Sequence, residues 1–199
     1  GKRPLIFHRY GGLGNQRYQI GFSGDVVINW KSLAYQPWFT ATAANVGFGF
    51  WSHDIGGHMQ PFNNKIKQDP ELFTRWVQWG AFSPIFRTHA TADPDIERRM
   101  WQYPAPYFDA MKKAVLQRYS LLPYIYTYSR MAYDSGVSLI RPIYYQHPDN
   151  KEAYHCPQQY YFGDNMIVAP ICKSMSRKET AEQTIWLPDG NWYDFRNNK

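Results

Sequence analysis

Four polar side chains that can bind a ligand or exchange a proton stand at the ends of predicted strands. Arg9 ends the run PLIFHR, Asp25 follows GFSG, Asp54 follows FGFWSH, and His89 follows PIFRT. A lone Asp after Gly or Ser is most often a helix N-cap or a turn residue. Four such residues in series predict a shared site, because the carboxyl ends of the strands form the active-site mouth of a β/α barrel.

This set carries the groups that hydrolysis of a glycosidic bond requires. One carboxylic acid must protonate the leaving oxygen, and a second group must attack the sugar or activate water. A cation and an imidazole nearby can hold hydroxyl groups and adjust those carboxyls. The residue types alone leave open which carboxylate would protonate the leaving oxygen and which would act as the nucleophile.

A metal site is a weaker interpretation of the same stretch. His53, Asp54 and His58 are close in sequence, but their spacing matches no standard zinc motif on a helix. Gly56-Gly57 would also break a helix at this point. We therefore do not expect a metal ion here.

Other polar residues have simpler structural interpretations. GFSGD resembles a nucleophile elbow around Ser23 only loosely, because Asp25 stands where that motif requires a second Gly. His8 should point away from Arg9 by strand alternation, and we expect it to be buried structure. The run 97–99, Glu-Arg-Arg, is typical of a surface ion pair.

The elements that would position the four residues alternate between strand and helix. The strand-like runs are apolar on both faces, as parallel strands covered by helices should be. They cover residues 4–9, 18–22, 46–51 and 83–88. The helical stretches cover residues 30–44, then 70–80 with Asp69 as N-cap, then 107–134 with a bend at Pro123. This pattern predicts an α/β fold of about four β/α units.

The pattern changes after Gly136. Short strand-like runs follow, separated by Pro, Gly, Asn and Asp: LIRPIYYQ, QQYYFG, NMIVAPI, TIWLP and NWYDF. They predict an antiparallel β unit. We place the boundary between two domains here, with residues 1–136 in the first and 137–199 in the second.

Composition narrows the class of protein. Of 199 residues, 44% are hydrophobic and 19% charged, which indicates a globular chain. The net charge of +6 is spread over short basic clusters rather than one stripe, which argues against a nucleic-acid partner. Residues 32–52 carry no charge, but their Gln, Pro, Thr and Asn argue against a membrane span. The two Cys residues do not indicate a cellular compartment, so the localisation stays unknown.

The stretches around the four residues resemble those of glycoside hydrolase family 31, the α-glucosidase and α-xylosidase family. HRYGGLGNQRYQIGFSGD resembles the stretch from a substrate-binding Arg to the acid/base Asp, and VGFGFWSHDIGGHM resembles the next strand. RWVQWGAFSPIFRTH, LQRYSLLPYIYT, GDNMIVAPI and IWLPDGNWYDF continue the likeness over almost the whole chain. The resemblance implies the second half of a (β/α)8 TIM-type barrel, followed by part of an antiparallel β-domain.

The resemblance also implies a role for each residue. Asp25 would be the catalytic acid/base, and Arg9, Phe22, Trp51, Asp54 and His89 would bind the substrate. The family often has Trp where Phe22 stands, so an aromatic wall is kept without the indole N–H. The implied reaction is retaining and exo-acting on terminal α-linked sugars of an oligosaccharide. The first expected substrate is an α-glucoside, and an α-xyloside or α-galactoside is the alternative. The reaction needs no metal or cofactor.

The family nucleophile is an Asp on an earlier strand, in a motif that we do not find before Arg9. We therefore expect a fragment of a longer glycosidase that is inactive by itself, or else a sugar-binding or structural piece. The open strand edges of half a barrel favour self-association into a homo-oligomer.

Overall fold

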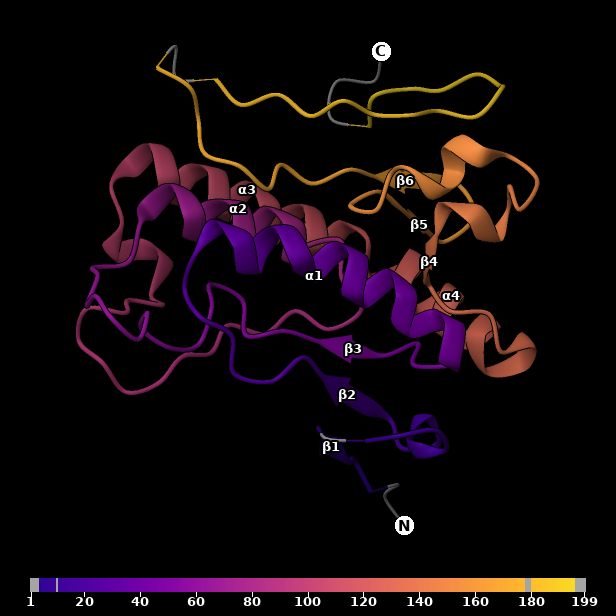
Figure 1. Ribbon diagram of the computed structural model, residues 1–199, viewed down its shortest axis with the longest axis horizontal. Coiled ribbons are helices and arrows are strands. Elements are labelled where there is room, and N and C mark those ends of the chain that lie inside the picture. The colour runs from indigo at the N-terminus through magenta and orange to yellow at the C-terminus, as the bar shows by residue number, and fades with distance from the viewer. Residues whose placement is uncertain (1–3, 10, 178–179, 196–199) are drawn as a thin grey trace.

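The computed structural model describes residues 4–9, 11–177 and 180–195. Its first part is a parallel sheet of three short strands, β1 (Phe7–His8), β2 (Ile20–Phe22) and β3 (Trp51–Ser52), in that spatial order. Figure 1 shows the three strands side by side below helix α1. Gly21 pairs with Trp51 and Phe22 with Ser52, so the carboxyl ends of β2 and β3 lie at the same edge.

The strands are shorter than the sequence predicts, and the fourth predicted strand is wrong. Residues 83–88 form no strand and are joined to the sheet by one parallel bridge between Ile55 and Thr88. The Ser83 hydroxyl donates hydrogen bonds to the carbonyls of Gly80 (2.7 Å) and Ile85 (3.0 Å). Such local side-chain bonds compete with ladder hydrogen bonding.

Helices α1 (Trp30–Ala43) and α2 (Pro70–Gly80) confirm the two shorter helical predictions. The Asp69 carboxylate accepts a hydrogen bond from the Glu71 backbone N–H at 2.9 Å, which is the expected N-cap. Asn29 caps α1 in the same way by accepting from the N–H of Ser32 at 2.7 Å. Local capping signals therefore place the starts of both helices.

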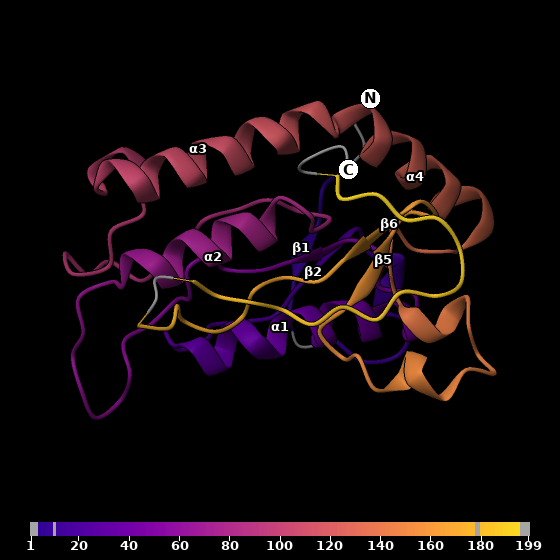
Figure 2. The same ribbon diagram turned by 90° about the horizontal axis from the view of Figure 1, so that it is seen from above.

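The predicted helix over 107–134 is two helices, α3 (Ala105–Ser120) and α4 (Leu122–Ser135), and the interruption lies two residues before the bend expected at Pro123. The break falls at Leu121, which ends α3 and precedes α4 with φ −85° and ψ −2°. Pro123 lies in the first turn of α4, where its missing N–H is not needed. Figure 2 shows α3 and α4 running along one side of the molecule, with α2 between α3 and α1.

The second sheet is antiparallel, as predicted. It contains β4 (Ile140–Pro142), β5 (Tyr160–Phe162) and β6 (Met166–Val168), with Ile140 opposite Phe162 and Tyr160 opposite Val168. The strands predicted within residues 184–188 and 191–195 are wrong, since that described segment has no strand. Short 3-10 turns cover Asn15–Arg17, Ala44–Val46, Met100–Gln102, Ile143–Tyr145 and Lys151–Tyr154.

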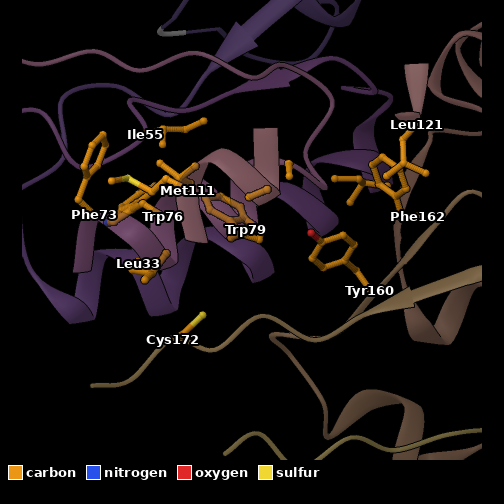
Figure 3. Close-up of a cluster of buried hydrophobic side chains, with 14 of the residues drawn as sticks. Leu33, Ile55, Phe73, Trp76, Trp79, Met111, Leu121, Tyr160, Phe162 and Cys172 are labelled. Carbon is orange, nitrogen blue, oxygen red and sulfur yellow. The ribbon is translucent and has the colours of Figure 1, made fainter. Parts of the chain in front are cut away.

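One hydrophobic core joins the helices to the second sheet. Figure 3 shows Phe73, Trp76 and Trp79 of α2 between Leu33 of α1 and Met111 of α3, all of them at most 1% exposed. Side chains of β5 belong to the same core. Tyr160 also donates its hydroxyl to the carbonyl of Phe82 at 2.8 Å, which ties β5 to the loop after α2. None of the helices that the structure describes is long and apolar enough to cross a membrane.

Candidate active site

The four residues predicted from strand ends come together in one cluster, joined by two side chains that were not assigned to it from sequence. Contacts run from Arg9 to Asp25, from Asp25 to His58, and from His58 to both Asp54 and His89. Arg87 joins the cluster through Asp54. We call these six residues the strand-end cluster.

Asp25 stands at the solvent side of the strand-end cluster. Nη1 of Arg9 donates a hydrogen bond to Oδ1 of Asp25 at 2.6 Å, and both side chains are about one-third exposed. The other carboxylate oxygen, Oδ2, lies 3.8 Å from Nε2 of His58. A charge-assisted bond on one oxygen fixes the carboxylate, while exposure leaves it accessible to a ligand.

Asp54 is fully buried at the base of the strand-end cluster, with 0% exposure. A buried carboxylate is costly without partners. Nη2 of Arg87 pairs with its Oδ1, and Nε of Arg87 donates to the Ser52 hydroxyl at 3.3 Å. The second oxygen, Oδ2, lies 3.0 Å from Nδ1 of His58, but the two atoms lack hydrogen-bond alignment. Neither atom makes a hydrogen bond to any residue that the structure describes.

His58 is the residue that links the two carboxylates. Its side chain is 15% exposed, and its ring centroid lies 5.1 Å from that of His89, which is exposed. Gly56 (φ +104°) and Gly57 (φ +82°) turn the chain so that residue 58 comes back over Asp54. From sequence, His58 was considered only as a metal ligand. The positive-φ requirement of the Gly-Gly turn was the available signal.

Arg87 is the other residue of the strand-end cluster that was missed. Its guanidinium lies over the rings of Phe7 (5.0 Å) and Phe22 (5.3 Å), which favours a fixed orientation. Residues 87 and 89 are two apart on an extended segment, so they share a side. That alternation is the sequence signal that pairs Arg87 with His89.

The two aromatic residues expected to bind substrate lie on opposite sides of the sheet. Phe22 stacks on Phe7 at 5.1 Å and lies 5.5 Å from the Arg9 guanidinium, beside the strand-end cluster. The structure does not bring Trp51 there. Its ring packs edge-on against Phe39 of α1 at 5.2 Å and against Phe48 at 5.5 Å. Trp51 therefore packs on the helix side of the sheet, away from Asp25.

His53, next to Asp54 in sequence, is buried behind the strand-end cluster with 0% exposure. Its Nε2 lies 3.2 Å from the Thr40 hydroxyl and its Nδ1 lies 3.4 Å from Oε1 of Gln36. Burial, and secondarily the nearby Arg87 charge, lowers the pKa of His53 to about 3. His53 is thus a neutral core residue, and because its ring nitrogens face Thr40 and Gln36 it is not part of the group formed by Asp54, His58 and His89.

The remaining polar residues considered from sequence keep structural roles. His8 packs against the rings of Tyr18 and Phe48, and its ring nitrogens are buried. The Ser23 hydroxyl is buried and makes no hydrogen bond to a described residue, so no base among them activates it.

The run 97–99 divides in two. Arg99 pairs with Glu97 at 2.7 Å at the surface, as expected. Arg98 instead turns inward, donates to Oε1 of Gln68 at 2.8 Å and also bonds the carbonyl of Gly57. Burial lowers the pKa of Arg98 to about 10, and its contact beside residue 58 supports the turn that carries His58.

Three members of the strand-end cluster also match the donor types that a metal ion requires. One ligand atom from each of Asp54, His58 and His89 can be chosen so that all three lie within 4.8 Å of one another. Two surface hollows, of about 490 and 240 Å³, lie elsewhere on the described residues, around His147–Lys151 and Trp186–Asp189. Polar side chains also line these hollows, but no residue of the strand-end cluster does.

Comparison with known families matches both parts of the chain. Residues 1–128 match the Glycosyl hydrolases family 31 TIM-barrel domain, and residues 136–199 match the Glycosyl hydrolase family 31 C-terminal domain. The first match alone covers more than half of the chain, and it contains the whole strand-end cluster.

Curated relatives point the same way. The chain is 34% identical to an alpha-xylosidase of Saccharolobus solfataricus over 98% of its own length and 26% of the relative's. It is 32% identical to Alpha-glucosidase 2 of Bacillus thermoamyloliquefaciens, again over 98% of the chain but 23% of the relative. The chain therefore spans about a quarter of the length of these relatives.

Solved structures share the fold. A Flavobacterium johnsoniae GH31 dextranase in complex with glucose superposes with a TM-score of 0.81 at 30% identity, over 92% of this chain and 22% of that one. A cycloalternan-degrading enzyme from Trueperella pyogenes, in complex with a covalent intermediate, gives a TM-score of 0.89 at 25% identity, over 100% and 27% of the two chains. The chain described here belongs to glycosyl hydrolase family 31.

Proposed function

We propose that this chain is part of a retaining, exo-acting α-glycosidase that releases terminal α-linked sugars from oligosaccharides. The α-glucosidase activity is our first choice, and α-xylosidase or α-galactosidase activity is the alternative within the family. Relatives named for α-glucosidase and for α-xylosidase activity both support the general reaction.

The observation that carries this proposal is the convergence of Arg9, Asp25, Asp54 and His89 within one chain of contacts. Each comes from a different strand end or loop, and they are far apart in sequence. A set of carboxylate, guanidinium and imidazole groups gathered at one sheet edge is suited to binding and protonating a sugar.

In the proposed mechanism, Asp25 protonates the leaving glycosidic oxygen and then deprotonates the incoming water. Its exposed position allows both contacts. Asp54 is fully buried and ion-paired with Arg87, which suits a fixed acceptor for sugar hydroxyls better than an attacking group. Arg9 and His89 would orient further hydroxyls, and Phe22 would provide an apolar wall.

We propose the following division of the chain. Residues 1–136 form the C-terminal half of the catalytic (β/α)8 barrel, and residues 137–199 form the start of a C-terminal β-sandwich domain. The parallel sheet, the antiparallel sheet and the two family matches support this division. The nucleophilic carboxylate would come from a part of the barrel outside this chain, and no metal or cofactor takes part.

The experiment is an assay of the full-length gene product on a panel of α-glycosides whose leaving groups need protonation, comparing wild type with Asp25→Asn. Turnover of one glycoside should fall by about 100-fold or more in the variant, the usual range for loss of a general acid. Asp109→Asn, an exposed carboxylate on α3, is the matched control and should keep wild-type activity. Equal activity in wild type and Asp25→Asn would contradict the proposal.

A second candidate is a non-catalytic sugar-binding or structural piece. It is favoured by the fact that the one exposed carboxylate of the strand-end cluster, Asp25, has no second free carboxylate beside it among the described residues. Turnover by the 199-residue chain alone, lost in Asp25→Asn, would exclude this candidate. Sugar binding without turnover, by both the chain and the full-length product, would favour it.

A further inference from the structure

We propose that Asp54, His58 and His89 form a binding site for a divalent transition-metal ion of the zinc type. The ion would act as a competitor of the sugar and not as a cofactor. The donor set is one carboxylate and two imidazoles, which are ligands that Zn²⁺ uses in three-residue sites with an open position. The competition with sugar rests on the proposed function, whereas metal binding itself does not.

The ligand atoms are already close to the required arrangement. Oδ2 of Asp54 and Nδ1 of His58 lie 3.0 Å apart, close to the separation of about 3.3 Å expected for two ligands of a tetrahedral zinc ion. All three ligand atoms lie within 4.8 Å of one another. The ring of His89 is exposed, so it can turn by a rotamer change to close the remaining gap.

Two of these atoms are also buried without hydrogen bonds. Asp54 is fully buried, and neither its Oδ2 nor Nδ1 of His58 has a hydrogen-bond partner among the described residues. A buried acceptor left without a hydrogen bond is destabilising, and more so when it is charged. A ligand that coordinates or hydrogen-bonds both atoms would remove that destabilisation.

The residues behind the ligands support a metal as well. A metal-binding His usually donates its other ring N–H to a carboxylate, and a ligating carboxylate is itself hydrogen-bonded. His58 has its Nε2 3.8 Å from Oδ2 of Asp25, and Asp54 has its Oδ1 paired with Arg87. Asp54 therefore has the supporting bond that such sites use, while Nε2 of His58 faces the Asp25 carboxylate at more than hydrogen-bond distance.

The test is a calorimetric titration of ZnCl₂ into the full-length gene product and its variants. We expect one saturable site in the wild type and a loss of affinity of at least about 100-fold in His58→Gln and in His89→Gln, since removing a supporting partner alone costs about 10–100-fold. His155→Gln removes an exposed imidazole of the second domain and should change nothing. Because His89 is exposed, its variant should fold normally.

A second measurement reports on the ligands directly. Bound Co²⁺ should give visible absorption bands typical of a low coordination number, and these bands should vanish in His89→Gln. Wild type and His89→Gln binding Zn²⁺ equally, or wild type without a saturable site, would overturn the inference. Zn²⁺ binding in a protein without glycosidase activity would support the metal site and count against both the competition with sugar and the proposed function.

Discussion

Acid should destabilise the fold through His53, the neutral imidazole buried beneath the strand-end cluster. Its pKa is about 3 in the folded chain, against 6.5 for the free side chain. Between these values the unfolded chain binds a proton that the folded chain does not, so stability rises with pH. The stabilisation that His53 contributes is complete at pH values above its pKa in the unfolded chain. It is lost as the pH falls toward its pKa in the folded chain.

The size of the effect follows from these two pKa values. Lowering the pH from about 7.5 to about 5 should reduce the free energy of unfolding by about 2 kcal/mol through His53 alone. The replacement His53→Gln has no titrating group but keeps an amide that can bond Thr40 and Gln36. The free energy of unfolding of this variant should therefore fall by about 2 kcal/mol less than that of the wild type over the same pH change.

The assay is urea unfolding of wild type and variants at the two pH values, followed by circular dichroism. Comparing each protein with itself cancels the baseline cost of the substitution, and His155→Gln, at an exposed position, should behave as wild type. An equal loss of stability on acidification in wild type and His53→Gln would refute the reasoning, because it would show that His53 does not carry the proton uptake.

Three further predictions concern the turn, the core and the sheet edge. Gly57→Ala should reduce stability by about 1–3 kcal/mol and weaken sugar binding, because Gly57 has φ +82° and a Cβ there would lie 2.9 Å from Cγ1 of Ile28. Urea unfolding and ligand titration would check it, and unchanged values would contradict it. Arg118→Met should cost about 3–5 kcal/mol, because the buried Arg118 bonds the carbonyls of residues 81, 83 and 84 and leaves them unpaired when removed. Thermal unfolding would measure that loss, and a change within about 0.5 kcal/mol, the usual range for surface positions, would refute it. The 199-residue chain alone should self-associate through the edge strand β1, whose Phe7 is 44% exposed, and a monodisperse monomer in light scattering would contradict this.

Local signals were sufficient where one residue decides the structure. Asp69 before Pro70 placed the start of α2, because a capping carboxylate and a Pro in the first turn act within a few residues. The same reasoning misplaced the break between α3 and α4, since a Pro in a first turn does not bend a helix. Strand lengths were overestimated because apolar runs show what is buried but not where ladder pairing ends.

The candidate site was partly predictable for a related reason. The series of polar strand ends predicted Arg9, Asp25, Asp54 and His89, because parallel strands end at a common edge. His58 requires the positive-φ turn before it to return over Asp54, which is a tertiary arrangement that spacing does not reveal. Trp51 was placed by resemblance, and only its packing against α1 shows which side of the sheet it occupies.

The measurement that tests the central claim most directly compares two substrates in Asp25→Asn. One should be an aryl α-glycoside with a strongly acidic phenol, which leaves without protonation, and the other an oligosaccharide whose leaving alcohol needs a proton. If Asp25 is the proton donor, kcat/KM for the aryl α-glycoside, which reports on the glycosylation step, should change little in the variant. For the oligosaccharide, kcat/KM should fall by about 100-fold or more. Equal losses on both substrates, or none on either, would contradict the account.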